Sequence, residues 1–283
     1  MGKSGAAPLA LGTLAVAAGA AFLTIVGAMP GMATRNVLAY ALGLVLGWLA
    51  HKVAHVRHGT AGLFAAGSAI LALVLVAGIE LDGVRRWLPV GPFAVQPALI
   101  LAPLLLAIVA AREGRHWRIA ILLPIGLVAL QPDGATLVAL ALGVAALMAG
   151  ASGQSRRGWS ARRIAIAAGA LALATLGLLV SGIQTPPPVA FVEGTVELAL
   201  LGGSAAIALH VAAVGLAVAA LASRGGAADL ALAAYFAAAA LAAAFWAFPM
   251  PIAGAGPSHL AGFGLAIGWL AEGIRRARRT ELA

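Results

Sequence analysis

Long runs of apolar residues fill most of the chain, and charged residues, Gly or Pro interrupt these runs at intervals. A run of about 20 apolar residues is long enough to cross the roughly 30 Å hydrocarbon core of a bilayer as a helix. The pattern therefore predicts about ten membrane-spanning helices joined by short loops. Their approximate bounds are 8–28, 36–55, 60–80, 96–112, 117–131, 134–151, 162–182, 195–222, 228–248 and 258–275.

Two of these stretches, 96–112 and 117–131, are short and contain prolines such as Pro103 and Pro124. Proline removes a backbone donor and clashes with the preceding turn, so these helices are expected to be tilted, kinked or partly buried against their neighbours. The first stretch is longer than the core of a signal peptide and more spans follow it. It therefore predicts a retained helix, with the mature protein starting near Met1.

Small residues are abundant, with 36 glycines in the chain. Gly43 and Gly47 lie four residues apart in one predicted span, and Gly264 and Gly268 do so in another. Small residues at this spacing allow two membrane helices to approach closely. We expect a packing role for these glycines.

Composition excludes a water-soluble fold, since 63% of the 283 residues are hydrophobic and only 10% are charged. The mean hydropathy of +1.03 agrees. The predicted fold class is an all-α polytopic membrane protein, with residues 1–283 forming a single transmembrane domain. Cysteine is absent, which excludes disulfides and thiolate metal sites.

The net charge of +9 follows a topological pattern. With the N-terminus inside, only Arg35, Arg85 and Arg86 of the 18 basic residues fall outside, which leaves fifteen in cytoplasmic loops and ends. Short cytoplasmic loops of membrane proteins are enriched in Lys and Arg. The asymmetry predicts that both termini are cytoplasmic, and it explains the positive charge without a nucleic acid partner.

Histidines give only weak signals of chemistry. His51, His55 and His58 lie on one side of a predicted helix end, a geometry that can hold a metal but more often gives solvated side chains. His210 is the lone ionisable residue deep inside a long apolar span, where a hydrogen bond to a neighbouring helix is the commoner role. A substrate path through a transporter would also suit His210. We predict no metal site and no cofactor.

The segment between the third and fourth predicted spans combines two cations with an aromatic side chain. Arg85 and Arg86 precede Trp87 at the expected outer surface. Such a group can meet the diphosphate of a lipid-linked anion, and it can equally serve as a membrane anchor.

Two further outer segments have irregular backbone signals. The turn 131–136 contains Asp133, which can cap the helix that follows it. The segment 248–258 is rich in Pro and Gly and leads into the last span. Irregular backbone at membrane depth is tolerated mainly where it is buried in protein or lines a cavity.

Taken in chain order, these segments and a Glu-Leu-Ala-Leu-Leu-Gly run at 197–202 resemble the motifs of the SEDS family (shape, elongation, division and sporulation; RodA/FtsW-like proteins). Four similar motifs in the right order, together with about ten spans and cytoplasmic ends, make the resemblance specific. The residues that carry it are Arg85, Arg86, Trp87, Gln96, Pro97, Gln131, Asp133, Thr136, Glu197, Pro249, Pro251, Gly256 and Ser258.

The resemblance implies a protein of the bacterial inner membrane that works in cell-wall and peptidoglycan biogenesis, in cell shape or in division. It implies a lipid-linked glycan precursor or another polyprenyl lipid as ligand. It also implies a possible membrane partner, such as a single-span transpeptidase-like protein.

The sequence departs from the family pattern at two places. The family has Ser and Glu after the Gln-Pro pair and a Lys nearby, whereas this chain has Ala98, Leu99 and Ala102. The family also has a long extracytoplasmic loop that ends near its catalytic Asp, whereas only Ser181 to Thr195 separates the spans here. A membrane-embedded ion pair and most of that loop are therefore missing.

The missing loop leaves the position of the catalytic acid open. The family's Asp falls at Pro188 or at Ala190, depending on where the gap is placed. Glu193 is the best substitute as a general base, provided that a partly apolar setting raises its pKa. The short loop is expected to give Glu193 little support against a substrate.

Two functions follow from these observations. In the first, the chain is a non-catalytic relative that binds a lipid-linked glycan precursor or scaffolds a membrane partner. In the second, it is a minimal peptidoglycan glycosyltransferase that polymerises lipid-linked disaccharide. The first function is favoured, because it explains the lost loop and the lost acids without requiring replacements.

Overall fold

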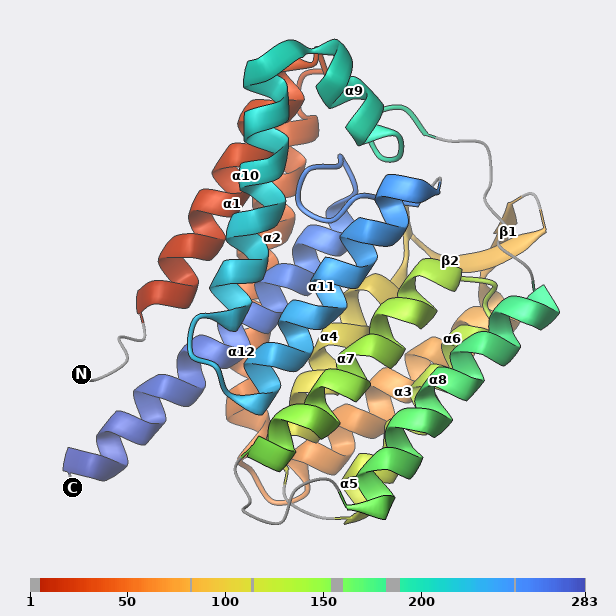
Figure 1. Ribbon diagram of the computed structural model, residues 1–283, viewed down its shortest axis with the longest axis vertical. Coiled ribbons are helices and arrows are strands. Elements are labelled where there is room, and N and C mark those ends of the chain that lie inside the picture. Colours follow the sequence, from red (N-terminus) through yellow and green to blue (C-terminus); the bar gives the residue numbers. More distant parts are fainter. Residues whose placement is uncertain are drawn as a thin grey trace.

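The computed structural model describes residues 6–81, 83–112, 115–153, 160–181, 189–246 and 248–282, which form a bundle of helices with a small sheet at one side (Figure 1). The helices are α1 (Ala6–Ile25), α2 (Met32–Ala54), α3 (Gly59–Ala77), α4 (Pro97–Ala110), α5 (Arg115–Ala120), α6 (Leu122–Ala129), α7 (Gly134–Gly153), α8 (Ala161–Ser181), α9 (Thr195–Leu201), α10 (Gly203–Ala222), α11 (Ala227–Phe245) and α12 (Pro257–Leu282).

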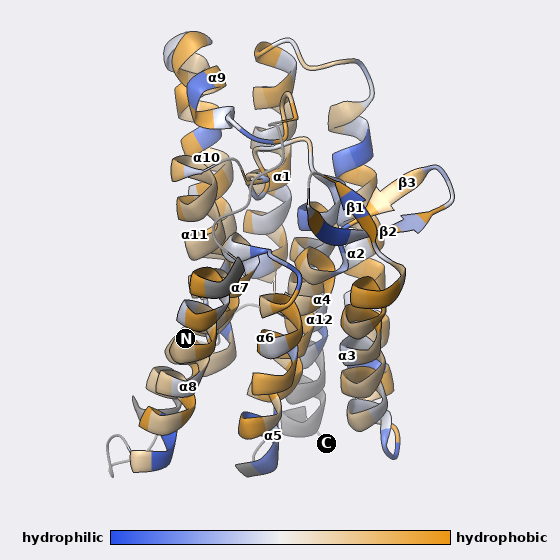
Figure 2. Ribbon diagram, turned by 90° about the vertical axis from the view of Figure 1, so that its right-hand side faces the viewer, coloured by the Kyte–Doolittle hydropathy of each residue, from blue (hydrophilic) through white to orange (hydrophobic). Residues whose placement is uncertain are grey.

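Within the described residues, six helices are long and apolar enough to cross a membrane: α1, α2, α3, α8, α10 and α11. Three shorter apolar stretches lie at Pro97–Ala110, His116–Ala129 and Gly134–Gly150. Figure 2 shows hydrophobic positions along the lengths of the helices and hydrophilic positions mainly near their ends. The predicted all-α polytopic membrane fold is confirmed, and the predicted count of ten spans stays a prediction.

Two predicted spans are interrupted. The stretch 117–131 divides into α5 and α6 at Ile121, three residues before Pro124, as expected for a proline that cannot donate to the preceding turn. The stretch 195–222 divides into α9 and α10 at Gly202 and Gly203, where Gly203 has a φ of 81°. Glycine adopts this left-handed conformation readily, so the chain can turn there.

The sheet was not predicted. Strands β1 (Ile79–Leu81), β2 (Val84–Val90) and β3 (Phe93–Val95) form an antiparallel sheet in the order β1-β2-β3. Val90 pairs with Phe93 across a two-residue turn in which Gly91 has a φ of 57°. Positive φ at the first turn residue suits Gly, and Pro92 suits the second, so local sequence explains the tight hairpin.

Glycines form the close contact between α2 and α12. A Cβ added at Gly43 or Gly47 would overlap the carbonyl oxygen of Ala261 or Leu265, and one added at Gly264 would overlap that of Tyr40. The two pairs of glycines therefore face each other across one helix crossing. The predicted packing role is confirmed.

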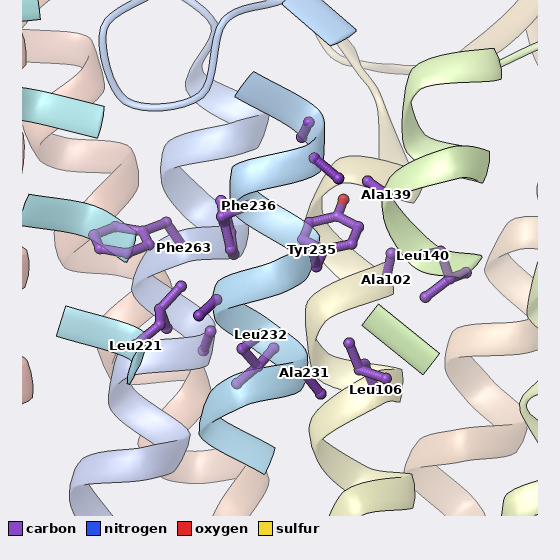
Figure 3. Close-up of a cluster of buried hydrophobic side chains, with 14 of the residues drawn as sticks. Ala102, Leu106, Ala139, Leu140, Leu221, Ala231, Leu232, Tyr235, Phe236 and Phe263 are labelled. Carbon is purple, nitrogen blue, oxygen red and sulfur yellow. The ribbon is translucent and has the colours of Figure 1, made fainter. Parts of the chain in front are cut away.

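The centre of the core lies around α11, which packs mainly against α7 and also against α10 and α4 (Figure 3). Tyr235 and Phe236 of α11 are essentially fully buried, with exposed fractions of 0% and 1%. Phe236 contacts the ring of Phe263 in an edge-to-face arrangement, with 5.4 Å between ring centroids. Leu106 of α4 and Leu140 of α7 complete this part of the core.

The ends of the helices divide the molecule into two sides. The start of α1 and the end of α12 lie at the side opposite the sheet (Figure 1). The sheet, the turn before α7, the segment 189–194 and the loop 248–256 lie at the other side, which is called the hairpin side below. Figure 1 thus places both ends of the described chain on one side of the bundle.

Candidate functional site

Arg86 of β2 reaches into the bundle from the hairpin. Its side chain is only 1% exposed and lies over the rings of Trp87 and Phe248, at 4.6 and 5.6 Å from their centroids. Its Nη1 atom forms an ion pair with Oδ1 of Asp133 at 4.0 Å. A buried cation is stable only when such partners offset its desolvation. Nε and Nη1 of Arg86 have no hydrogen-bond partner in the described part of the chain, so the two ring contacts and this long ion pair are the contacts that oppose its desolvation.

Asp133 is the central acceptor of this region. Its Oδ2 accepts a hydrogen bond of 2.7 Å from the Gln96 side chain, and its Oδ1 accepts one of 3.3 Å from the backbone N–H of Thr136. The latter bond caps the N-terminus of α7, as the sequence predicts. Asp133 thus joins the hairpin, α4 and α7 through one carboxylate.

Other polar residues of the predicted motifs lie around the Arg86–Asp133 pair. The backbone N–H of Gln96 donates to Oγ of Ser258 at the start of α12, at 3.2 Å. Gln131 donates from its side chain to the carbonyl oxygen of Leu71, at 2.8 Å. Arg86, Asp133, Gln96 and Ser258 are called the polar cluster below. It brings together motifs from β2, α4, α7 and α12.

A small cavity adjoins the polar cluster. Its volume is about 10 Å³, and its lining includes Gln96, Asp133, Thr136 and His259. This volume is enough for about one water molecule. Both ring nitrogens of His259 and Oγ1 of Thr136 are buried, without a hydrogen-bond partner in the described part of the chain. The cavity is too small for a lipid diphosphate in this structure.

Arg85, the other cation of the hairpin, points to the surface. Its guanidinium forms a 2.8 Å ion pair with Glu80, and the two side chains are 42% and 53% exposed. It also donates to the carbonyl oxygen of Leu75 at 3.2 Å, which ties the hairpin to the end of α3. Trp87 is half-buried, in contrast to the buried Arg86. Arg85 is thus the more accessible of the two cations.

Glu193 lies in the segment 189–194, on the hairpin side. It is partly buried, and its Oε2 accepts a 2.6 Å hydrogen bond from the backbone N–H of Val189. Burial raises the pKa of the Glu193 carboxyl above its usual value, while the Val189 N–H and the positive charge of Arg86 oppose this rise. The direction of this shift agrees with the condition set for Glu193 as a general base, and that role stays a prediction.

Backbone contacts hold the segment that carries Glu193, contrary to the expectation of little support. The N–H of Met250 donates to the carbonyl oxygen of Val192 at 3.1 Å, and that of Ala255 donates to the carbonyl oxygen of Phe191 at 2.7 Å. The loop 248–256 therefore supports this segment through its backbone. Sequence alone could not predict this pairing, because it joins segments distant in the chain.

Side chains of α2 hold the loop 248–256 in turn. Asn36, which is only 2% exposed, donates from Nδ2 to the carbonyl oxygen of Gly254 at 2.8 Å. Arg35 donates to the carbonyl oxygen of Ala255 at 3.3 Å. Neither residue was a predicted site residue. An Asn near the start of an apolar span is the sequence signal that could have indicated this role.

The remaining predicted residues fall into three groups. Pro97 opens α4, and Pro249, Pro251 and Gly256 shape the loop before α12. Glu197 is exposed in the first turn of α9 and so lies in a short separate helix, instead of entering the predicted span 195–222, because the chain breaks at Gly202.

The alternatives for the family's catalytic Asp are divided between described and undescribed residues. Ala190 lies in an exposed turn and carries no ionisable group. Pro188 lies outside the described residues, as does Arg157 of the predicted cytoplasmic loops.

His210 forms the expected interhelical bond, at 3.1 Å from Oγ1 of Thr195. His259, in contrast, was missed, although a histidine in the first turn of an apolar span could have indicated it.

Comparison with known proteins agrees with this arrangement. Residues 7–192 match the sequence profile of the FtsW, RodA and SpoVE family, described as cell cycle proteins. An 87-residue segment is 39% identical to a probable peptidoglycan glycosyltransferase FtsW of Allochromatium vinosum. That segment covers 29% of this chain, and it spans about a fifth (22%) of the relative.

Solved structures show the same fold. The rod shape determining protein RodA of Thermus thermophilus matches with a TM-score of 0.63 at 22% identity, over 97% of both chains. A chain from a peptidoglycan synthase complex matches with a TM-score of 0.62 at 22% identity, over 94% of this chain and 97% of that one. With a family profile that matches well over half of its length, the chain belongs to the FtsW, RodA and SpoVE family, the SEDS family of polytopic membrane proteins.

Proposed function

We propose that this SEDS-family protein of cell-wall synthesis is a binding and scaffold protein of the bacterial inner membrane. It holds a lipid-linked glycan precursor at the outer face and organises a membrane partner, without polymerising the glycan itself. In this proposal the hairpin side faces outward and both termini are cytoplasmic, as the distribution of basic residues predicts.

The observation that carries the proposal is the burial of Arg86 beside Asp133. A glycosyltransferase needs positive charge for the departing diphosphate. Arg86 is 1% exposed and faces the carboxylate of Asp133 at 4.0 Å, so its charge lies inside the bundle and away from the surface. Asp133 in turn is used by Gln96 and by the N-terminus of α7. The polar cluster therefore supports a structural role, in which it fixes the hairpin on the bundle.

Arg85 is the group best suited to contact a lipid diphosphate. It is half-exposed and lies two residues before Trp87 in β2, and its pairing with Glu80 is a surface ion pair that costs little to break. A phosphate can then accept charge-assisted hydrogen bonds from the freed guanidinium. In this proposal Arg86 does not touch the lipid, and it contributes to binding only by holding the hairpin on the bundle.

A membrane partner is consistent with the structural relatives. One of them belongs to a peptidoglycan synthase complex, in which polymerization and crosslinking are coordinated. A single-span transpeptidase-like protein is the partner that we propose by this analogy.

Glu193 favours a second candidate, a minimal peptidoglycan glycosyltransferase. The carboxyl is partly buried with a raised pKa, and the backbone around it is fixed by the loop 248–256. These are the properties of a general base, which typically contributes about 10²–10⁴-fold to a rate. The backbone bonds to the loop 248–256 support this second candidate, because the short connection alone is expected to give Glu193 little support.

A gel-based polymerisation assay with lipid-linked disaccharide separates the two candidates. The proposal predicts no glycan chains from purified wild type or from Glu193→Gln, although both bind polyprenyl diphosphate and Arg85→Gln binds it more weakly. Glycan chains from wild type that disappear in Glu193→Gln would establish the enzyme instead. Equal lipid binding by Arg85→Gln and by the control Arg57→Gln would remove Arg85 from the site.

A further inference from the structure

The tip of the hairpin is an uncharged apolar surface without a protein partner in the described structure. Residues 89–94 are all exposed, and Val90 and Phe93 are 56% and 58% exposed. The sequence contains no charged residue from Trp87 to Ala111. Soluble proteins rarely expose contiguous apolar patches to water, so the tip is better suited to an apolar environment.

The hairpin is anchored beside the end of α3. Arg85 at its base donates to the carbonyl oxygen of Leu75, and Figure 2 shows β2 and β3 projecting sideways from the bundle. Along α3, Ile70, Leu73 and Val76 are exposed by 40%, 48% and 83% at a spacing of three residues. This spacing puts them on one face of the helix. That face is suited to lipid, and it ends where the hairpin begins.

Two features limit the depth of the hairpin. The exposed Arg85–Glu80 pair at its base requires water or lipid headgroups, because charged groups are costly in hydrocarbon. Strands β1 and β3 are the edges of the sheet, so their outer backbone groups also need polar partners. The sheet therefore belongs at headgroup level, while single side chains of its tip reach the top of the acyl chains.

We infer that the hairpin is a lipid-binding element, whose tip residues Val90 and Phe93 insert shallowly into the outer leaflet beside α3. The occupant is the bilayer itself, as indicated by the absence of charge, the continuity with the apolar face of α3 and the half-buried Trp87, a residue type enriched at membrane interfaces. The insertion would hold Arg85 at the depth of the lipid phosphates. It does not depend on the ligand or the activity proposed above.

The absence of cysteine allows a clean test by site-directed labelling. Phe93→Cys and Val90→Cys are labelled with the environment-sensitive fluorophore NBD, in nanodiscs of phosphatidylethanolamine and phosphatidylglycerol. Leu73→Cys, 48% exposed on α3, is the control for a lipid-facing position. Val56→Cys, 65% exposed in the loop between α2 and α3, is the control for water.

The inference predicts blue-shifted emission from both tip positions and from Leu73→Cys. At the tip, a nitroxide near the top of the acyl chain should quench this emission more than one deep in the bilayer. Aqueous iodide should quench only Val56→Cys strongly. Iodide quenching of both tip positions equal to that of Val56→Cys would overturn the inference. Blue-shifted emission that no lipid nitroxide quenches would also overturn it, because protein would then cover the tip.

Discussion

Two regions on the hairpin side carry ionisable side chains, and the fold treats them in opposite ways. The polar cluster buries Arg86 and Asp133 almost completely, each at 1% exposure, and joins them through side chains. The segment 189–194 leaves Glu193 partly exposed and is fixed through its backbone, which bonds to the loop 248–256. One region uses its charges for structure, whereas the other holds a charge that is still available to a ligand.

The difference follows from the free energy of desolvation. Removing two charges from water costs several kcal/mol per ion, which only close partners offset, so substitutions at the polar cluster are expected to change stability. At position 193 the side chain accepts one hydrogen bond, from the N–H of Val189, and the segment is otherwise held by its backbone. That side chain can therefore be selected for chemistry or binding at little cost to the fold.

The largest effect is expected from Asp133→Ala in the polar cluster. The change removes the ion-pair partner of a buried arginine and the cap of α7. It should lower the free energy of unfolding by about 3–5 kcal/mol, the usual cost of leaving a buried charge unpaired. Thermal unfolding of the purified protein in detergent measures the loss.

Glu80→Gln is the matched control, because it removes the acid of an exposed ion pair on the same hairpin. Exposed pairs contribute about 0–1 kcal/mol, so the control should unfold close to wild type. If Asp133→Ala lost no more stability than Glu80→Gln, the polar cluster would not have the structural role that distinguishes it from the segment 189–194.

A smaller effect is expected from Asn36→Ala, which tests the support of the segment 189–194. The change leaves the buried carbonyl oxygen of Gly254 without its donor, which should cost about 1–3 kcal/mol in unfolding free energy. A Glu193→Cys reporter should also react faster with a thiol reagent in this background, since the loop beneath it loosens. Thr24→Ala, which removes an exposed hydrogen bond to Ala20, should change neither measurement. An unchanged labelling rate in Asn36→Ala would show that α2 does not support the segment 189–194.

The smallest effect is expected from Glu193→Gln, and it depends on pH. The folded pKa of Glu193 lies above its unfolded value, so the folded state binds this proton more readily. Wild type should therefore lose stability as pH rises from the usual carboxyl pKa through the folded pKa. Glu193→Gln cannot ionise, and its amide oxygen can still accept from Val189. The variant should be slightly more stable at neutral pH, and the two unfolding curves should converge at acidic pH. A difference independent of pH would contradict the raised pKa.

Much of the fold could be predicted because it depends on neighbours in the sequence. Apolar runs specify helices wherever their length matches a bilayer, and the glycine pairs at spacing four indicate helix faces that can pack closely. Only the structure shows that α2 and α12 meet at these faces. Asp133 caps α7 because it immediately precedes the helix. The breaks at Pro124 and at Gly202–Gly203 also have local causes, although only the first was predicted.

The tertiary structure alone decided what the charged residues do. Arg85 and Arg86 are adjacent in the sequence and look equivalent, yet one faces the surface and the other lies against Asp133. Glu193 bonds to Val189 within its own segment, but that segment is joined to the rest of the protein by backbone bonds to the loop before α12. Helices form from contacts a few residues apart, whereas burial, ion pairing and pKa depend on which distant segments meet. The sequence of this protein therefore determined its spans and its family resemblance, and the packing of those spans determined which of its charges are structural and which remain available.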